Sequence, residues 1–179
     1  MAQSAFVAAD LTAEPVDDSE SHVLQPLLDR CEDYHQVVYG RPALPDQARN
    51  IPSQRPPGLV PGQGHLFALR DARGTLAGML EALRDYPAQG EWYLGLLLLA
   101  PEARGQGRGE AVLSAYEAHV RANGGRLLRL AVVERNTAAR RFWERVGFQP
   151  EQWVGPIEHG LRWNRVLKMT KQLGPPPSA

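Results

Sequence analysis

A glycine-rich segment at residues 104–109 is the part of the sequence whose residue types and spacing could do chemistry. It reads Arg-Gly-Gln-Gly-Arg-Gly and follows an apolar run at 91–99 and an Ala-Pro-Glu turn. Glycine admits left-handed backbone and close approach of a ligand, so that successive amide N–H groups can converge on one anion. A helix beginning just after these glycines adds partial positive charge. The segment therefore predicts a phosphate-binding turn.

The spacing excludes two common phosphate loops. No Gly-Lys-Ser/Thr follows, as a Walker A loop requires, and the glycines are spaced G-x-G-x-G and not G-x-G-x-x-G. Antiparallel strands are expected before the turn, and only one strand–helix–strand unit is expected after it, which is not typical of a dinucleotide fold. A general nucleotide-phosphate binder stays open on the glycine turn alone.

A second motif occupies the helix expected at 137–146. Asn136 is a natural N-cap for this helix, and Gly147-Phe148 predicts a Schellman stop at its end. The motif residues are Asn136, Ala139, Phe142, Trp143, Glu144, Gly147 and Phe148.

Together the two motifs resemble the GNAT N-acetyltransferase superfamily. That family's pyrophosphate loop reads Arg/Gln-x-x-Gly-x-Gly/Ala, which residues 104–109 match, and its later motif reads Asn-x-x-Ala-x-x-Phe-Tyr-Glu-x-x-Gly-Phe. The motifs cover about residues 91–150, and the order of elements extends the likeness over most of the chain. The resemblance implies an α/β (α+β) fold, with a mixed, mostly antiparallel sheet of about six to seven strands flanked by helices. The length predicts one domain, at 1–173, and the residues GPPPSA predict a disordered tail at 174–179.

The resemblance also implies acetyl-CoA as cosubstrate and the residues that hold it. The pantetheine arm would pair with strand backbone, the pyrophosphate would sit on the loop amides, and the second motif would contact the arm. The implied cofactor-binding residues are Leu97, Leu98, Leu99, Arg104, Gly105, Gln106, Gly107, Arg108, Gly109, Glu110, Asn136 and Trp143. The implied reaction moves an acetyl group to a primary amine of a small molecule or peptide by direct attack in a ternary complex.

The attacking amine must be neutral. Deprotonating a lysine-like amine at pH 7 costs roughly 4–5 kcal/mol, whereas an α-amine costs only about 1 kcal/mol. A general base or a water chain is therefore expected for a lysine or polyamine, and Glu81 and Glu134 are the first candidates for the base. Weaker candidates for the base are Glu91, Tyr93, His65 and His119. The backbone N–H of Leu99 is the expected oxyanion donor.

Two positions depart from the family's pattern. Trp143 stands where many relatives have a Tyr that protonates the leaving thiolate, and Ala131 stands where some carry a catalytic Glu. Indole cannot act as that acid near neutral pH. These departures leave an alternative open, a non-catalytic acyl-CoA-binding sensor or regulatory module.

Composition limits the partners. The 179 residues hold 20 Lys+Arg and 20 Asp+Glu, and a formal net charge of zero argues against nucleic acid or a membrane surface. A single cysteine, Cys31, excludes a disulfide framework and a thiolate-rich zinc site, so that no metal is expected. No signal peptide or spanning segment is evident, which predicts a cytoplasmic protein.

The charge is unevenly distributed. Residues 1–60 carry nine acids and four bases, whereas residues 61–179 carry eleven acids and sixteen bases. This split suggests that N-terminal acids border the entrance for a cationic acceptor. The acids in question are Asp17, Asp18, Glu20, Asp29, Glu32 and Asp33.

The elements that must position these residues follow from periodicity and turn signals. The expected strands are 4–9, 65–70, 75–84, 91–99, 126–133 and 161–170, and the expected helices are 21–39, 110–122 and 137–146. Prolines make 41–64 a long loop. Substrate specificity is expected in 20–64 and in a loop at 150–160. Exposed strand edges make a homodimer possible.

Overall fold

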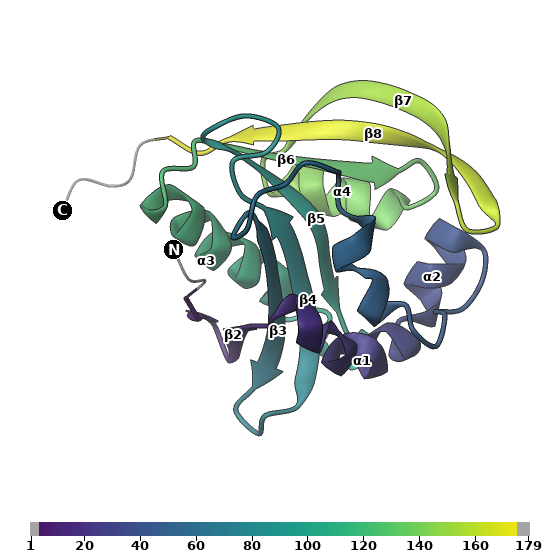
Figure 1. Cartoon of the computed structure of the whole chain (residues 1–179), viewed down its shortest axis with the longest axis horizontal. Helices are drawn as coiled ribbons and strands as arrows, with labels where there is room; N and C mark the ends of the chain where they lie inside the picture. The colour runs from purple at the N-terminus through teal and green to yellow at the C-terminus, as the bar shows by residue number, and fades with distance from the viewer. Residues whose placement is uncertain (1–3, 175–179) are drawn as a thin grey trace.

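The computed structural model describes residues 4–174 of the chain. Eight strands form one sheet, and helices cover both of its faces (Figure 1). The strands are β1 (Phe6–Ala8), β2 (Leu11–Pro15), β3 (Gly64–Asp71), β4 (Leu76–Leu83), β5 (Glu91–Leu99), β6 (Leu127–Val133), β7 (Gln149–His159) and β8 (Arg162–Gln172). The α-helices are α1 (Gln25–Arg30), α2 (Glu32–Tyr39), α3 (Arg108–Ala122) and α4 (Thr137–Arg145).

The strand order is β1-β2-β3-β4-β5-β6-β8-β7. All neighbouring pairs are antiparallel except β5 and β6, which run parallel. The predicted antiparallel meander of β3, β4 and β5 is therefore confirmed. The α+β class is also confirmed, with eight strands where six to seven were expected.

The pairing of β5 with β6 is short, and this shapes the site. Only Glu91–Tyr93 of β5 pair with Leu127–Arg129 of β6, although β5 continues to Leu99. Beyond that point β6 pairs with β8 on its other side. The two central strands thus diverge and leave backbone groups of β5 without a strand partner.

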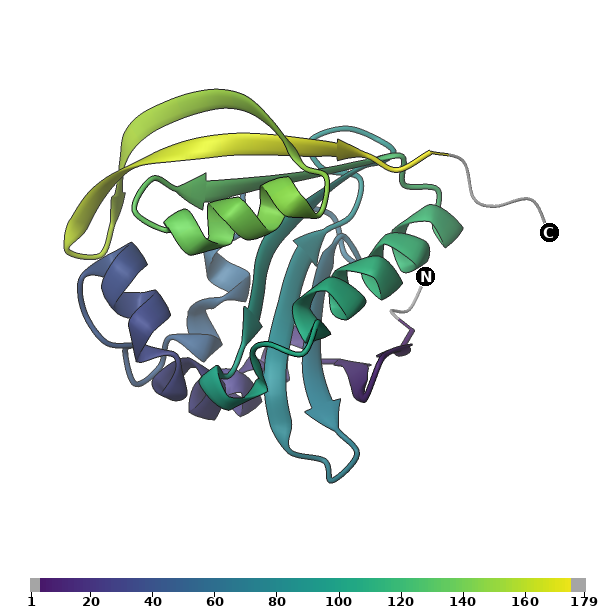
Figure 2. The same ribbon diagram turned by 180° about the vertical axis from the view of Figure 1, so that it is seen from behind.

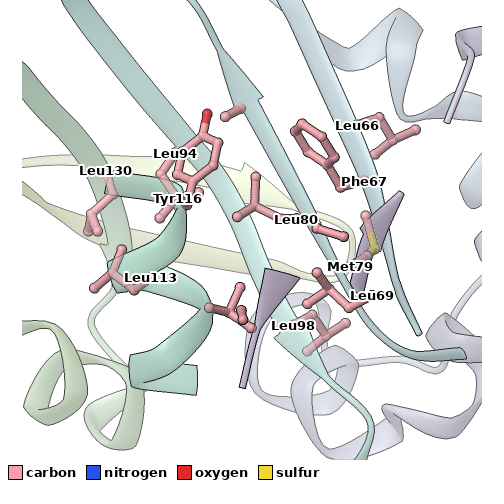
Figure 3. Packing of buried hydrophobic residues seen from close by; sticks show 14 of the residues in the cluster. Leu66, Phe67, Leu69, Met79, Leu80, Leu94, Leu98, Leu113, Tyr116 and Leu130 are labelled. Carbon is pink, nitrogen blue, oxygen red and sulfur yellow. The ribbon is translucent and has the colours of Figure 1, made fainter. Parts of the chain in front are cut away.

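The core includes residues on both faces of the sheet, and one part of it lies between the sheet and the helix α3. The side chains of Phe67 in β3, Leu80 in β4 and Leu94 in β5 pack toward Leu113 and Tyr116 of α3 (Figure 3). All five are at most 2% exposed. Burial on this scale stabilises the fold by about 1.5–3 kcal/mol for each large apolar side chain.

Figure 2 shows α3 and α4 on one face of the sheet, with α1 and α2 on the other. The predicted stop after α4 is confirmed, because Gly147 has φ +98° and the amide of Phe148 donates to the carbonyl of Trp143 at 2.9 Å. The corresponding stop after α3 uses Gly124, with φ +83°. No helix in residues 4–174 is both long and apolar enough to cross a membrane.

The single helix expected at 21–39 is wrong. A 3-10 turn, Asp18–Leu24, precedes α1, and α1 ends one residue before Cys31, which separates it from α2. Pro26 lies in the first turn of α1 as predicted, because it has no N–H to donate to an earlier turn. The break redirects α2 toward the opening between β5 and β6.

Two strands were missed. β2 is only five residues long and ends in Pro15, and β7 occupies the segment expected to be a loop. β7 is the last strand of the sheet and carries two register shifts, one after Pro150 and one around Gly155 and Pro156. An edge strand tolerates proline because one of its sides needs no donor, so the composition concealed it.

The proline-rich segment 41–64 is irregular, as predicted, apart from two short 3-10 turns, Ala48–Asn50 and Pro52–Gln54, and the start of β3. It passes over the same face as α1 and α2 (Figure 1). The predicted tail lies outside the described residues, except for Gly174.

Candidate active site

The glycine-rich turn has the backbone that an anion site requires. Gly105, Gln106 and Gly107 have φ values of +80°, +53° and +73° in succession, and Gly107 is the N-cap of α3. A Cβ built at Gly105 or Gly107 meets nothing within 4 Å, so that a ligand can approach the backbone there. The first amides of a helix have no intrahelical partner. The turn therefore presents free N–H donors to open space.

A cavity of about 650 Å³ runs from this turn into the space between β5 and β6. We call it the interstrand cavity. Its lining includes ten of the twelve residues expected to hold the cofactor; Gln106 and Arg108 are not among them. The ten are Leu97, Leu98, Leu99, Arg104, Gly105, Gly107, Gly109, Glu110, Asn136 and Trp143.

Strand β5 offers alternate backbone groups to this cavity. The amide of Ala100 donates to Ala77 of the strand before it at 2.8 Å, and Leu98 is paired with Met79 of β4. Because hydrogen-bonding direction alternates along an antiparallel strand, the backbone groups of Leu97 and Leu99 point to the diverging side. Leu98 directs its own groups to β4, so its backbone is not available in the way expected.

A second cavity of about 690 Å³ lies beside the first, between α2, the proline-rich segment and the sheet. We call it the side cavity. The linings of both cavities share Tyr34, Tyr39, Tyr93, Gly95, Leu96 and Leu130. The two cavities therefore meet where β5 leaves β6.

Gly95 forms a bulge at this meeting point. The register of β4 and β5 shifts there, with Leu94 opposite Ala82 and Leu96 opposite Glu81. A Cβ at Gly95 would lie 2.6 Å from Oε2 of Glu81, so a larger residue at this position would displace that carboxylate from its observed place. The position of the Glu81 carboxylate therefore depends on the absence of a side chain at Gly95.

Glu81 is held by Arg55 from the proline-rich segment. Nε of Arg55 donates to Oε1 of Glu81 at 3.1 Å, and Nη1 donates to both carboxylate oxygens of Asp18 at 2.8 and 2.9 Å. The side chain of Arg55 is 8% exposed and that of Glu81 is 18% exposed. Burial raises the pKa of Glu81, and the Arg55 guanidinium opposes that rise. Glu81 is thus a carboxylate with raised basicity and one oxygen facing Gly95.

The other base candidates are less well placed. Glu134 is half exposed, lies 3.7 Å from Arg165 and lines neither cavity. Glu91 is paired with Arg129 at 2.5 Å. Tyr93 does line both cavities, but burial raises its pKa, which keeps the phenol protonated. Only Glu81 and Tyr93 among the acidic and phenolic candidates reach the site.

His65 and His119 lie in an aromatic cluster that also includes Trp92 and Tyr116. Their ring centroids are 5.0–6.2 Å apart, and neither histidine lines either cavity. Burial lowers the pKa of His65 to about 4 and also lowers the pKa of His119. Both are neutral core histidines at neutral pH.

One of the N-terminal acids singled out by the charge split, Asp18, borders the side cavity by pairing with its lining residue Arg55. None of the six lines the side cavity itself, and Asp33 lines the interstrand cavity instead. Asp33 accepts hydrogen bonds from Arg104, which also donates to the carbonyl of Leu99 at 3.0 Å, and Arg104 lowers the pKa of Asp33. Asp10 forms the equivalent pair with Arg108. The acidic segment therefore compensates the arginines of the glycine turn.

The second motif lies on the opposite wall of the interstrand cavity. Oδ1 of Asn136 accepts from the amide of Ala139 at 3.1 Å, which confirms the N-cap and leaves its Nδ2 group available as a donor. Trp143 is 8% exposed and packs edge-to-face on Phe148. Ala131 also lines this cavity, so no carboxylate stands at that position.

Several residues of the site were not found by sequence reasoning. Tyr34, Tyr39 and Arg55 fall within the segment 20–64 expected to carry specificity, but nothing in their spacing singled them out. Lys168 was assigned only to a strand. Gly95 had a usable signal, because an isolated glycine inside an apolar strand predicts a bulge.

The chain matches the model of the acetyltransferase (GNAT) family over residues 24–148. None of the curated proteins matches it. The chain belongs to this family, and its fold agrees with the assignment. As a member of this family it is an N-acetyltransferase that uses acetyl-CoA as its cosubstrate.

Solved structures with the same fold include acetyltransferases of different kinds. An acetyltransferase from Thermus thermophilus is 23% identical, with a TM-score of 0.74 over 90% of this chain and 96% of the other. The spermidine N-acetyltransferase from Vibrio cholerae in complex with CoA and spermine is 16% identical, with a TM-score of 0.70 over 92% and 96%. A nourseothricin acetyltransferase is 22% identical, with a TM-score of 0.56 over 65% and 70%. At these identities the likeness establishes the fold.

Proposed function

We propose that the enzyme moves an acetyl group from acetyl-CoA to a primary amine of a small molecule or peptide by direct attack in a ternary complex. The observation that carries this proposal is that two cavities meet at the Gly95 bulge, beside Glu81. Two cavities allow both substrates to be bound at once. Their contact at one point brings the amine and the thioester within reach of each other.

The lining of the meeting point supports direct transfer. The six shared residues are tyrosines, leucines and a glycine, and they include no thiol, hydroxymethyl or amine group that could carry the acetyl group. Cys31 lines neither cavity, and its Sγ lies 3.6 Å from the carbonyl of Leu99. Burial also raises the pKa of this thiol. A covalent acetyl-cysteine step therefore has no support.

The interstrand cavity has the chemistry that acetyl-CoA needs. The open amides of the glycine turn and the start of α3 suit the pyrophosphate, with Arg104 at the entrance. The outward backbone groups of Leu97 and Leu99 suit the amides of the pantetheine arm, and Asn136 offers a donor across from them. When bound, acetyl-CoA supplies an acetyl group activated as a thioester.

We infer that Glu81 is the general base. An ammonium group in the side cavity must lose its proton before attack, and Oε2 of Glu81 faces the meeting point at Gly95. The raised pKa of this carboxyl improves its strength as a base, and its pairing with Arg55 favours the ionised form. Arg55 acts as a positioning residue, since it holds Oε1 and leaves Oε2 free.

The backbone N–H of Leu97 is a better oxyanion donor than that of Leu99. Leu97 is only two residues from Gly95, whereas Leu99 lies farther along the strand by about 7 Å and its carbonyl is bound to Arg104. Trp143 cannot protonate the departing thiolate. A thiol of pKa about 8.5 leaves readily as a thiolate, so the reaction does not require that acid.

The test is acetyl-CoA turnover, measured as free-thiol release across a panel of amines. We expect Glu81→Gln to lower kcat about 100-fold while the KM for acetyl-CoA is unchanged. Glu134→Gln is the control and should behave like the wild type. Equal losses in both variants, or none in either, would exclude Glu81 as the base. Tighter binding of ATP than of CoA would instead favour a nucleotide-phosphate binder.

A further inference from the structure

The side cavity contains five charged residues, and their pairing bears on what it binds. These are Arg55, Glu81, Arg129, Glu151 and Lys168. Both carboxylates are already engaged by an arginine. Glu81 is paired with Arg55 at 3.1 Å, and Glu151 accepts both of its bonds from Nη1 of Arg129 at 3.1 and 3.2 Å. No carboxylate of this lining is therefore free to hold a second ammonium group.

Lys168 is different. It is exposed, and among residues 4–174 it is the one charged lining residue of the side cavity without an ion-pair partner. It lies on β8 directly opposite Ala131 of β6 and opposite Gln152 of β7. The one unpaired charge among the described lining residues of the side cavity is thus the exposed ammonium group of Lys168.

We propose that the acceptor is an amine that also carries a carboxylate, and that Lys168 binds this carboxylate. The proposal rests on the proposed function, since it takes the side cavity as the acceptor site. Strand β8 lies two strand spacings from β5, which is about 10 Å, and the divergence of β5 from β6 adds to this separation. The amine at Glu81 and the carboxylate at Lys168 are therefore at opposite ends of an extended molecule.

The same arrangement disfavours a polyamine. A polyamine carries further ammonium groups and would place one of them near Lys168, where two like charges meet without a carboxylate between them. The fold is shared with a spermidine N-acetyltransferase, but the charges lining this cavity select a different kind of acceptor. Discrimination of this type depends on repulsion as much as on attraction.

Three probes of equal chain length test the proposal. They are ε-aminocaproate, aminohexanol and hexamethylenediamine, which have the same amine and a negative, neutral or positive far end. Their binding to the enzyme–CoA complex is measured by calorimetry, and their acetylation by thiol release. We expect ε-aminocaproate to bind at least about tenfold more tightly than the diamine, a difference of about 1.4 kcal/mol.

Variants of the two lysines sharpen the test. Lys168→Met should remove the advantage of ε-aminocaproate over aminohexanol, and Lys168→Glu should reverse the preference toward the diamine. Lys171→Met is the matched control, because Lys171 is on the same strand but is paired with Glu117 and lines neither cavity. It should keep the wild-type preference.

The outcomes separate this inference from the proposed function. Diamine binding as tight as that of ε-aminocaproate, no binding of ε-aminocaproate, or an unchanged preference in Lys168→Met would overturn the acceptor assignment. Faster acetylation of the diamine would overturn it while supporting N-acetyl transfer. Binding of ε-aminocaproate without thiol release on any amine would support the assignment and count against the catalytic proposal.

Discussion

The ion pair of Arg55 and Glu81 allows a prediction of both stability and pH dependence. Replacing Arg55 with Met removes one hydrogen bond to Glu81 and two to Asp18 while keeping an apolar stem. Asp18 is 56% exposed and can be hydrated, but Glu81 is only 18% exposed and is left without its partner. The expected loss is about 2 kcal/mol of unfolding free energy, because a poorly solvated charge keeps its desolvation cost.

The loss should depend on pH with a defined sign. Burial already raises the pKa of Glu81, and without Arg55 the pKa rises further. A carboxyl whose folded-state pKa is raised destabilises the fold once the pH exceeds its unfolded value, because ionisation then costs more in the folded chain. The deficit of Arg55→Met should therefore be larger at about pH 7.5 than near pH 4.5. The acid limb of kcat/KM should move to higher pH, because the base stays protonated longer.

Urea unfolding at the two pH values, together with a pH–rate profile, measures both effects. Arg70→Met is the matched control, since Arg70 pairs with Glu14 at the same 3.1 Å but with side chains 30% and 52% exposed. That exposed pair should contribute about 0.5 kcal/mol, with little pH dependence in this range. Equal losses in the two variants, or an acid limb that does not move, would refute the assignment of Glu81 as a buried base held by Arg55.

Three further predictions concern the bulge, the second motif and the glycine turn. Gly95→Ala should lower kcat at least about tenfold with CoA binding retained, because its Cβ would lie 2.6 Å from Oε2 of Glu81. Steady-state kinetics measures kcat and calorimetry measures CoA binding, and an unchanged kcat would contradict the prediction. Asn136→Ala should lose about 1 kcal/mol of unfolding free energy as well as affinity for CoA, whereas Asn136→Ser keeps a capping oxygen and should lose only affinity for CoA. Thermal unfolding with and without CoA separates the two effects. Full affinity for CoA in Asn136→Ser would exclude Nδ2 as a contact. Arg104→Gln should raise the Kd for CoA about tenfold or more and reduce the salt dependence of that Kd. A Kd equal to that of the wild type would show that Arg104 remains paired with Asp33 and does not contact CoA.

Much of the cofactor side was determined by local sequence. The turn at Gly105–Gly107 and the caps at Asn136 and Gly147 depend on neighbouring residues and on backbone conformations that few residue types adopt. The central meander follows from apolar periodicity and turn signals. These features were predictable because their causes lie within a few residues of one another.

The missed elements have a different origin. β7 contains Pro150 and Pro156, and it is a strand because its partner β8 supplies the hydrogen bonds and the sheet edge tolerates the prolines. The break of the expected helix at Cys31 accompanies the contact of that residue with Leu99, 68 positions later. Neither cause is visible in a short window of sequence.

The sequence by itself determined the family and the backbone of the glycine-rich turn that we propose binds phosphate, since both depend on local backbone preference and motif spacing. Only the tertiary structure revealed the side cavity that we propose as the acceptor site. It brought Arg55 to Glu81, Asp33 to Arg104 and Lys168 to the wall of the side cavity. Charge counts along the chain could not reveal these pairs, because electrostatic interactions depend on separation in space and on burial, which the folded sheet alone sets.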